Sequence, residues 1–162
     1  MYSSLNVHNR LQELDVPHEL FKLAGQAGSL ERAALALGLE LNQLAKVELF
    51  RADGETVMAI VPGDRCVDVD KLKAVSNATE IEPVPTEEIP SLTGYIANAL
   101  PPVGHKVDPT AYIDYYTLRE DVVYTGSGEP TAILKIRSYD LVRATGGETV
   151  DLVLPLAEGL DA

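Results

Sequence analysis

A short turn between two strand-like segments constrains the fold of this chain more than any other feature. Asp53-Gly54 stands between Ala45 to Ala52 and the apolar segment Thr56 to Val61, and such a pair is a strong signal for a two-residue β-hairpin. The second segment is almost unbroken in its apolar character, which is typical of a strand covered on both faces. The hairpin therefore predicts a mixed sheet with helices around it.

Residues that typically begin or end helices divide the rest of the chain into short elements. Helices are expected after the caps Ser3 or Ser4, Ser29, Asp68 or Asp70, Thr86 and Ser138, ending near Val16, Gly38, Val75, Gly94 and Ala144. Further strands are expected at Glu19 to Leu23, Glu80 to Val84, Tyr112 to Asp114, Asp121 to Thr125 and Thr131 to Ile136, with a helical turn at Asn42 to Leu44. The acidic chain end after Gly146-Gly147 is expected to fray. Without repeats or a long linker, residues 1–162 are predicted to form one α/β domain, with its core at about 16–152.

Charge and cysteine content narrow the class of function. The chain has 25 acidic and 13 basic residues, a formal net charge of −12. Such a surface repels nucleic acid at long range, which disfavours binding along duplex DNA but leaves open a small site for a nucleotide or one end of an RNA. The lone Cys66 suits a reducing compartment, and the sequence has neither a signal peptide nor a membrane-spanning segment. We expect a soluble, cytoplasmic protein with no membrane partner.

The segment Thr93 to Asp114 is predicted to be a ligand-binding loop, because from Tyr95 it has too many breakers for regular structure until the strand expected at Tyr112 to Asp114. Pro101 and Pro102 fix their own φ, and Gly104 permits a sharp turn. Amides that no sheet uses can bind a carbonyl or phosphate oxygen. These amides belong to Asn98, Ala99, Leu100, Val103 and Gly104. Composition alone favours the alternative, a structural crossover stiffened by proline.

Few side chains are candidates for chemistry. Lys46 begins a strand on the face opposite its apolar neighbours; it either meets a phosphate or carbonyl as a point charge or is solvated, and the residue alone favours solvation. His105 is the best titratable candidate because it follows a forced turn, although an exposed loop histidine is the usual outcome. Cys66 is expected to be a small buried hydrophobe, and Gly126-Ser127-Gly128 does not fit a nucleophile elbow. No metal site or other cofactor is predicted. Tyrosines that could stack on a base are Tyr112, Tyr115, Tyr116 and Tyr124, although packing is their commoner role.

A collinear set of segments carries a resemblance to a known family. In chain order they are SLERAALALG, AKVELF, AIVPGD, TGYIANALPPVGH, AYID, VVYTGSG and DLVRATGG. Together they cover most of the chain and resemble the YbaK/ProX family, the prolyl-tRNA-synthetase-associated editing domains that hydrolyse mischarged aminoacyl-tRNA. No single segment is diagnostic, but the set is fairly specific. The resemblance implies a curved, barrel-like mixed sheet surrounded by short helices, with a pocket for the aminoacyl-adenosine end of a tRNA.

The resemblance also implies roles for individual residues. Lys46 falls where the family keeps a lysine that contacts the substrate, and His105 and Asp114 fall in stretches that border the pocket. Gly128 matches a glycine in the turn after a later strand. The implied catalytic set is Lys46, Asn98, Ala99 and His105, and the implied substrate-binding set is Leu100, Pro101, Pro102, Gly104, Asp114 and Gly128. In such enzymes loop amides hold the ester carbonyl while water attacks it, helped by the substrate's ribose hydroxyl, so no serine or cysteine nucleophile is needed.

The loop departs from the family pattern at its centre. Where the family reads Gly-Gly-x-x-Pro, ending at Pro102, this chain has Asn98-Ala99-Leu100-Pro101-Pro102. We expect Asn98 to keep a left-handed turn, since Asn tolerates positive φ. The Ala99 methyl is expected to narrow the site, or to add strain of about 1 kcal/mol if its φ must be positive.

Two functions therefore stay open. One is a free-standing aminoacyl-tRNA deacylase that acts on the acceptor end, alone or with an aminoacyl-tRNA synthetase. The other is a YbaK-like binding or regulatory module that recognises an aminoacyl-adenosine or a synthetase without hydrolysis. The changed loop and the charge of −12 support the second function, and the collinear segments support the first.

Overall fold

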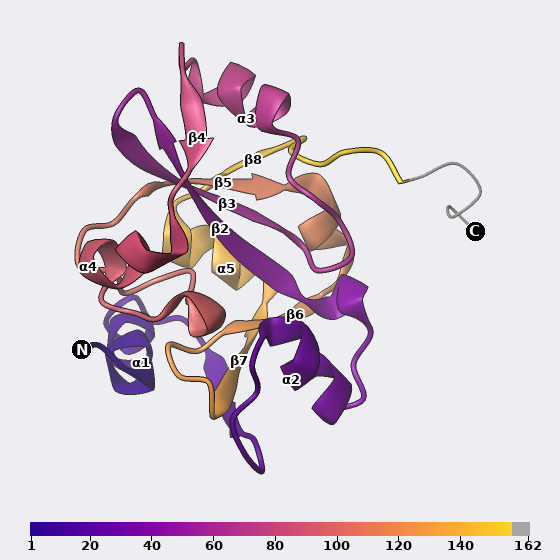
Figure 1. Cartoon of the computed structure of the whole chain (residues 1–162). Coiled ribbons are helices and arrows are strands. Elements are labelled where there is room, and N and C mark those ends of the chain that lie inside the picture. The colour runs from indigo at the N-terminus through magenta and orange to yellow at the C-terminus, as the bar shows by residue number, and fades with distance from the viewer. Residues whose placement is uncertain (157–162) are drawn as a thin grey trace.

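Eight strands form two sheets within residues 1–156, the part of the chain that the computed structural model describes (Figure 1). The larger sheet has the strand order β4-β2-β3-β5-β8, and the smaller has the order β1-β7-β6. The strands are β1 (His18–Lys22), β2 (Ala45–Ala52), β3 (Glu55–Pro62), β4 (Ile81–Pro83), β5 (Thr110–Asp114), β6 (Val122–Gly126), β7 (Ala132–Arg137) and β8 (Glu148–Val150). The α-helices are α1 (Ser4–Glu13), α2 (Leu30–Ala36), α3 (Val69–Ser76), α4 (Ile89–Thr93) and α5 (Ser138–Thr145). Short 3₁₀ helices lie at η1 (Leu41–Gln43), η2 (Thr86–Glu88), η3 (Ala97–Ala99) and η4 (Tyr115–Arg119).

The predicted hairpin is confirmed and lies at the centre of the larger sheet. Its antiparallel register runs from Ala45 opposite Pro62 to the turn. There, Asp53 and Gly54 have φ values of 51° and 85°, as the two central residues of a type I′ turn require. Because β3 also pairs in parallel with β5, both of its edges are hydrogen-bonded.

Strand β3 separates two hydrophobic clusters. Met58 and Ile60 face the larger cluster, to which α1, α5 and the smaller sheet contribute. Val57, Ala59 and Val61 face the other cluster, which α3 and the segment after β8 complete. The expectation of a strand covered on both faces is therefore confirmed.

The two sheets meet at one corner without closing into a barrel. A parallel bridge between Leu44 and Tyr124 joins them. The larger cluster, including Leu141 of α5, fills the space between the sheets. The mixed α/β fold is thus confirmed, but the expected barrel-like sheet is corrected to two sheets, because packed side chains instead of a continuous hydrogen-bond ladder join them.

Three of the predicted helix caps are confirmed. The hydroxyl of Ser3 accepts from the amide of Leu5, and the hydroxyl of Ser29 accepts from the amide of Arg32. Asp68 caps α3 through its carboxylate. No helix in the described part of the chain is long and apolar enough to cross a membrane.

Two expectations near the end of the chain are wrong. Ser138 is the first residue of α5 and is fully buried, while Arg137 holds the cap position, because the helix follows β7 directly and its start is drawn into the core. The chain after Gly146-Gly147 does not fray, since β8 pairs with β5 and Val67 bridges Val153. Residues 157–162 of the expected acidic end lie outside the described residues.

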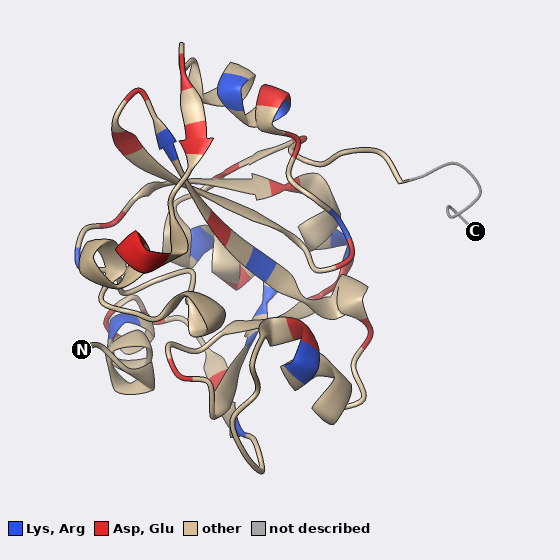
Figure 2. Ribbon diagram, in the orientation of Figure 1, with Lys and Arg blue, Asp and Glu red and all other residues tan. Residues whose placement is uncertain are grey.

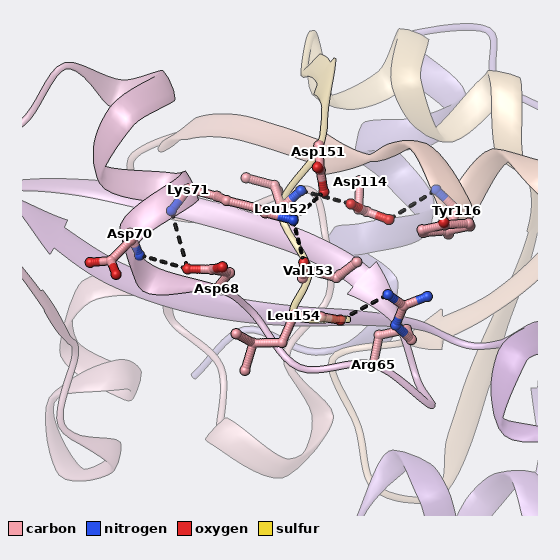
Figure 3. Close-up of polar contacts among 10 residues, drawn as sticks. All are labelled: Arg65, Asp68, Asp70, Lys71, Asp114, Tyr116, Asp151, Leu152, Val153 and Leu154. Carbon is pink, nitrogen blue, oxygen red and sulfur yellow. Dashed lines mark hydrogen bonds and ion pairs between the residues drawn. The ribbon is translucent and has the colours of Figure 1, made fainter. Parts of the chain in front are cut away.

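A buried carboxylate ties the end of β5 to the chain after β8 (Figure 3). Asp114 is fully buried, and its two oxygens accept from the amides of Tyr116 at 2.9 Å and Leu152 at 2.7 Å. An isolated buried charge is costly, whereas a carboxylate held by two amides is stabilised. Asp114 therefore joins η4 and the final segment to the sheet.

We predict that Asp114→Asn lowers the free energy of unfolding by about 1–3 kcal/mol, because the amide can replace one accepted hydrogen bond and turns a donor toward the other N–H. Urea unfolding followed by circular dichroism measures the change. Asp121→Asn, at an exposed aspartate, is the control and should alter stability by less than about 0.5 kcal/mol. Equal effects of the two substitutions would show that the buried contacts contribute nothing.

Candidate active site

Tyr95 holds the predicted loop against the rest of the molecule. Its side chain is fully buried, its hydroxyl donates to the carbonyl of Gly104 at 2.9 Å, and its ring meets that of Tyr2 edge-on. Burial raises the pKa of the Tyr95 phenol above its ordinary value, so the hydroxyl remains a donor. Tyr95 is not among the residues predicted from the sequence, because a buried tyrosine has no local pattern that distinguishes it from an exposed one.

The centre of the loop is the 3₁₀ turn η3, and its backbone is not left-handed. Neither Asn98 nor Ala99 has a positive φ, so the expectation that Asn98 keeps a left-handed turn is wrong, and Ala99 carries no such strain. The amide of Ala99 donates to the carbonyl of Ile96 at 3.2 Å, which removes it from the predicted set of available donors. No hydrogen bond from the amides of Asn98 or Leu100 is found within residues 1–156.

A glycine turn supports the loop from behind. The amide of Gly128 donates to the carbonyl of Ala99 at 2.8 Å, and Gly128 has a φ of 93° where it packs against the Tyr95 ring. At Gly126 a Cβ would overlap the carbonyl oxygen of Leu100, so only glycine fits. Gly128 is among the predicted site residues and Gly126 is not, because the requirement for glycine at position 126 comes from the backbone of a distant segment.

Lys46 lies near this corner but turns toward another segment. The parallel bridge between Leu44 and Tyr124 places the start of β2 beside β6. Lys46 lies two residues after Leu44, and Gly126 lies two residues after Tyr124. The half-buried ammonium of Lys46 donates to the carbonyl of Arg65 at 2.8 Å and lies 3.9 Å from the carboxylate of Glu48. No hydrogen bond between Lys46 and the loop is found in the described residues.

His105 is buried, contrary to the expectation of an exposed loop histidine. Its Nε2 lies 2.7 Å from the carbonyl of Pro101, which requires a proton on Nε2 because a carbonyl only accepts. Gly104 supplies the sharp turn before it, with a φ of 79°. His105 borders a cavity beside Thr56, at the turn end of the hairpin, whereas Lys46 stands at the open end. The structure therefore does not bring His105 and Lys46 together.

The structure does not bring all of the implied site residues together. Ala99 and Leu100 pack on Gly126 and Gly128, near the start of β2. Asp114 stands at the same end of the sheet as Lys46, with β3 between them, and spends both carboxylate oxygens on amides. Cys66, expected to be buried, is exposed. The described residues contain no group of three potential metal ligands.

The family described as aminoacyl-tRNA editing domain matches residues 24–144, and the chain belongs to this family. The predicted family is confirmed, and with it the class of activity, aminoacyl-tRNA editing, which is hydrolytic.

Similar proteins are both stand-alone and part of larger chains. The "Putative Cys-tRNA(Pro)/Cys-tRNA(Cys) deacylase EbsC" of Enterococcus faecalis is 22% identical over 91% of this chain and 92% of its own length. A "Proline--tRNA ligase" of Maridesulfovibrio salexigens is 32% identical over 66% of this chain but only 18% of the ligase. A crystal structure of "a putative trans-editing enzyme for prolyl tRNA synthetase" superposes with a TM-score of 0.86 at 25% identity, covering 96% of this chain and 99% of that one.

We predict that Gly126→Ala displaces the loop, because the new methyl and the carbonyl of Leu100 cannot occupy the same space. Urea unfolding should show a loss of about 1–3 kcal/mol, and the amides of residues 98–104 should exchange hydrogen faster. Gly25→Ala is the matched control, since nothing lies within 4 Å of its added methyl. If both variants behave like the wild type, the contact does not hold the loop.

We also predict a pH dependence from His105. Burial lowers its pKa below the ordinary value of 6.5, against a smaller raising effect of the Pro101 carbonyl. The unfolded chain therefore binds a proton more readily than the folded one. The stability contributed by neutral His105 is complete above the unfolded pKa and is lost as pH falls below it.

Unfolding free energies at about pH 7.5 and about pH 5.5 test this expectation. The wild type should lose more stability than His105→Phe, by up to about 1.4 kcal/mol per unit of pH. The other histidines are present in both proteins, so their titration cancels in the difference. An equal loss in both proteins would contradict the prediction.

Proposed function

We propose that the chain is a free-standing aminoacyl-tRNA deacylase that hydrolyses the ester of mischarged tRNA. Family membership supports the reaction, and the match to almost the whole length of a stand-alone relative supports action without a fused synthetase. The observation that carries the proposal is the loop backbone itself. It is held by Tyr95, Gly126 and Gly128, and the amides of Asn98 and Leu100 are among those that donate to nothing in the described residues.

In the proposed reaction these amides act on the ester carbonyl. The N–H groups of Asn98 and Leu100 are the proposed donors to the carbonyl oxygen of the ester. Fixed donors stabilise the negative charge that develops on this oxygen when water attacks. The substrate's ribose hydroxyl assists the attack. The acyl–oxygen bond then breaks, releasing a free amino acid and a tRNA with its terminal hydroxyl restored. A rigid backbone site of this kind needs no serine or cysteine nucleophile.

Lys46 supplies a fixed positive charge beside that loop. Its ammonium has three hydrogens, and the recorded hydrogen bond to Arg65 uses one of them. The others remain able to contact a phosphate or carbonyl oxygen of the substrate. His105 positions the loop through the Pro101 carbonyl, and Asp114 holds the adjoining end of the sheet. We propose that residues 1–162 act as one editing domain, in the cytoplasm where aminoacyl-tRNA is used, with a synthetase as an optional partner.

The second candidate is a module that binds an aminoacyl-adenosine or a synthetase without hydrolysis. The observations that favour it are the charge of −12 and the side chains of Asn98 and Ala99 in place of glycines. Because neither residue has a positive φ, the substitutions do not strain the backbone. This weakens the argument for lost catalysis and favours the enzyme.

A panel of mischarged tRNAs tests the proposal. We expect at least one ester to be cleaved faster than in buffer, and Lys46→Ala to lower kcat/KM for it by about 10²-fold, because a fixed charge at the reacting ester is lost. Lys22→Ala, at an exposed lysine on β1, is the control and should retain full activity.

Titration with a non-hydrolysable aminoacyl-adenosine analogue separates the two candidates. Binding of the analogue together with cleavage of an ester supports the enzyme, whereas binding without any cleavage supports the module. If no ester is cleaved and Lys46→Ala changes nothing, the enzyme proposal fails.

A further inference from the structure

A cluster of cations surrounds one aromatic ring at the open end of the hairpin. The guanidinium carbon of Arg65, in the turn after β3, lies 4.6 Å from the centre of the Tyr116 ring. That of Arg119, at the end of η4, lies 4.2 Å from the same centre. Contacts of this kind hold guanidinium groups in place without neutralising their charge. None of these residues belongs to the sets that the resemblance implied.

The cluster lines a cavity of about 720 Å³. Lys71 of α3 and Tyr115 of η4 contribute to the same wall, and the described chain ends beside it at Leu156. Figure 3 shows Arg65 and Tyr116 facing each other beside Asp114, with the segment Asp151 to Leu154 passing next to them. The cavity is large enough for a nucleotide-sized group.

The carboxylates of this cavity are already engaged, whereas its two arginines form no ion pair in the described residues. Asp114 accepts from two backbone amides, and Asp151 pairs with Lys71 at 3.0 Å. Arg65 donates to the carbonyl of Leu154, while its Nε is buried with no acceptor in the described residues. Within those residues neither Arg65 nor Arg119 has a carboxylate partner. The lining of the cavity therefore carries three cations, Arg65, Lys71 and Arg119, against two carboxylates.

This charge is unusual in its surroundings. Acidic residues lie on both sheets and on the surrounding helices (Figure 2), and the chain as a whole carries −12. An anion approaching such a surface is repelled except where cations are grouped. Guanidinium groups also match phosphate geometry through paired N–H donors. The chemistry that the cavity favours is therefore that of a phosphate group.

The cavity adjoins the candidate active site through Arg65, whose carbonyl accepts from the ammonium of Lys46. We propose that the cavity binds the phosphodiester backbone of the tRNA acceptor strand, beside the nucleotide that carries the ester. Arg65 and Arg119 contact the phosphate, and Tyr115, which is 58% exposed, stacks on an unpaired base. The inference rests on the proposed deacylase function, and it explains how an acidic chain captures an RNA at one place only.

Binding of deacylated tRNA tests the phosphate site without any need for hydrolysis. Fluorescence anisotropy with unfractionated tRNA and with an acceptor-stem hairpin gives Kd at salt concentrations from about 0.05 to about 0.2 M. Arg119→Gln should weaken binding several-fold at low salt and reduce the slope of log K against log salt by about 1. Arg119→Glu should weaken binding further. The double variant Arg65→Gln and Arg119→Gln should reduce the slope by about 2, twice the reduction of the single variant.

The controls make the same charge changes elsewhere. Arg137→Gln and Arg137→Glu alter an exposed arginine outside the cavity, and they should leave the Kd and the salt slope close to those of the wild type. In the kinetic assay the Arg119 variants should raise KM for aminoacyl-tRNA. They should change hydrolysis of an aminoacyl-adenosine ester, which has no stem phosphates, by less than about twofold, because removing a phosphate contact weakens binding without touching the ester.

Several results would overturn the phosphate site. These are an Arg137 effect equal to that of Arg119, a salt slope unchanged in the Arg119 variants, or no detectable RNA binding by the wild type. Binding of free AMP that depends on Arg119, without any change in RNA binding, would assign the cavity to a free nucleotide instead. Failure of the deacylase proposal is a separate outcome: no ester is cleaved, while the binding measurements still decide whether the cavity holds RNA.

Discussion

The parallel pairing of β3 with β5 is the constraint on which the rest of the structure depends. Two parallel neighbours require the chain to return to the end of the sheet where it started, so everything between Pro62 and Thr110 belongs to one long crossover. Helix α3, strand β4, helix α4 and the candidate loop all lie on this path. The loop is thus both a structural crossover and the candidate binding element, and the two interpretations of its prolines and glycines do not exclude each other.

Backbone contacts give this loop its rigidity. Gly126 lets the carbonyl of Leu100 approach strand β6 closely. The amide of Gly128 donates to the carbonyl of Ala99, and the hydroxyl of Tyr95 donates to the carbonyl of Gly104. A site that acts through fixed amides loses its advantage if those amides must reorient during the reaction. The packing behind the loop therefore matters to the proposed chemistry as much as the residues that face the substrate.

The distribution of charge divides the surface into a repelling and a receptive part. Most of the acidic side chains are exposed, so they face an approaching anion. Arg65 and Arg119 are instead held against the ring of Tyr116, and Arg65 also donates to the carbonyl of Leu154. An acidic surface with one cationic cavity favours a single orientation of an anionic ligand, because every other approach is repelled.

The sequence by itself determined those features that depend on neighbours in the chain. The Asp53-Gly54 turn and the caps at Ser3 and Ser29 were predicted because the residues that make these contacts lie within a few positions of one another. The resemblance to the family was likewise found from the order of segments along the chain. Only the tertiary structure decided that Gly126 must be glycine and that His105 is buried, because each depends on what packs against it, in the case of Gly126 a carbonyl 26 positions away in the sequence. Local patterns cannot encode such contacts, since the identity of the facing group is fixed by topology.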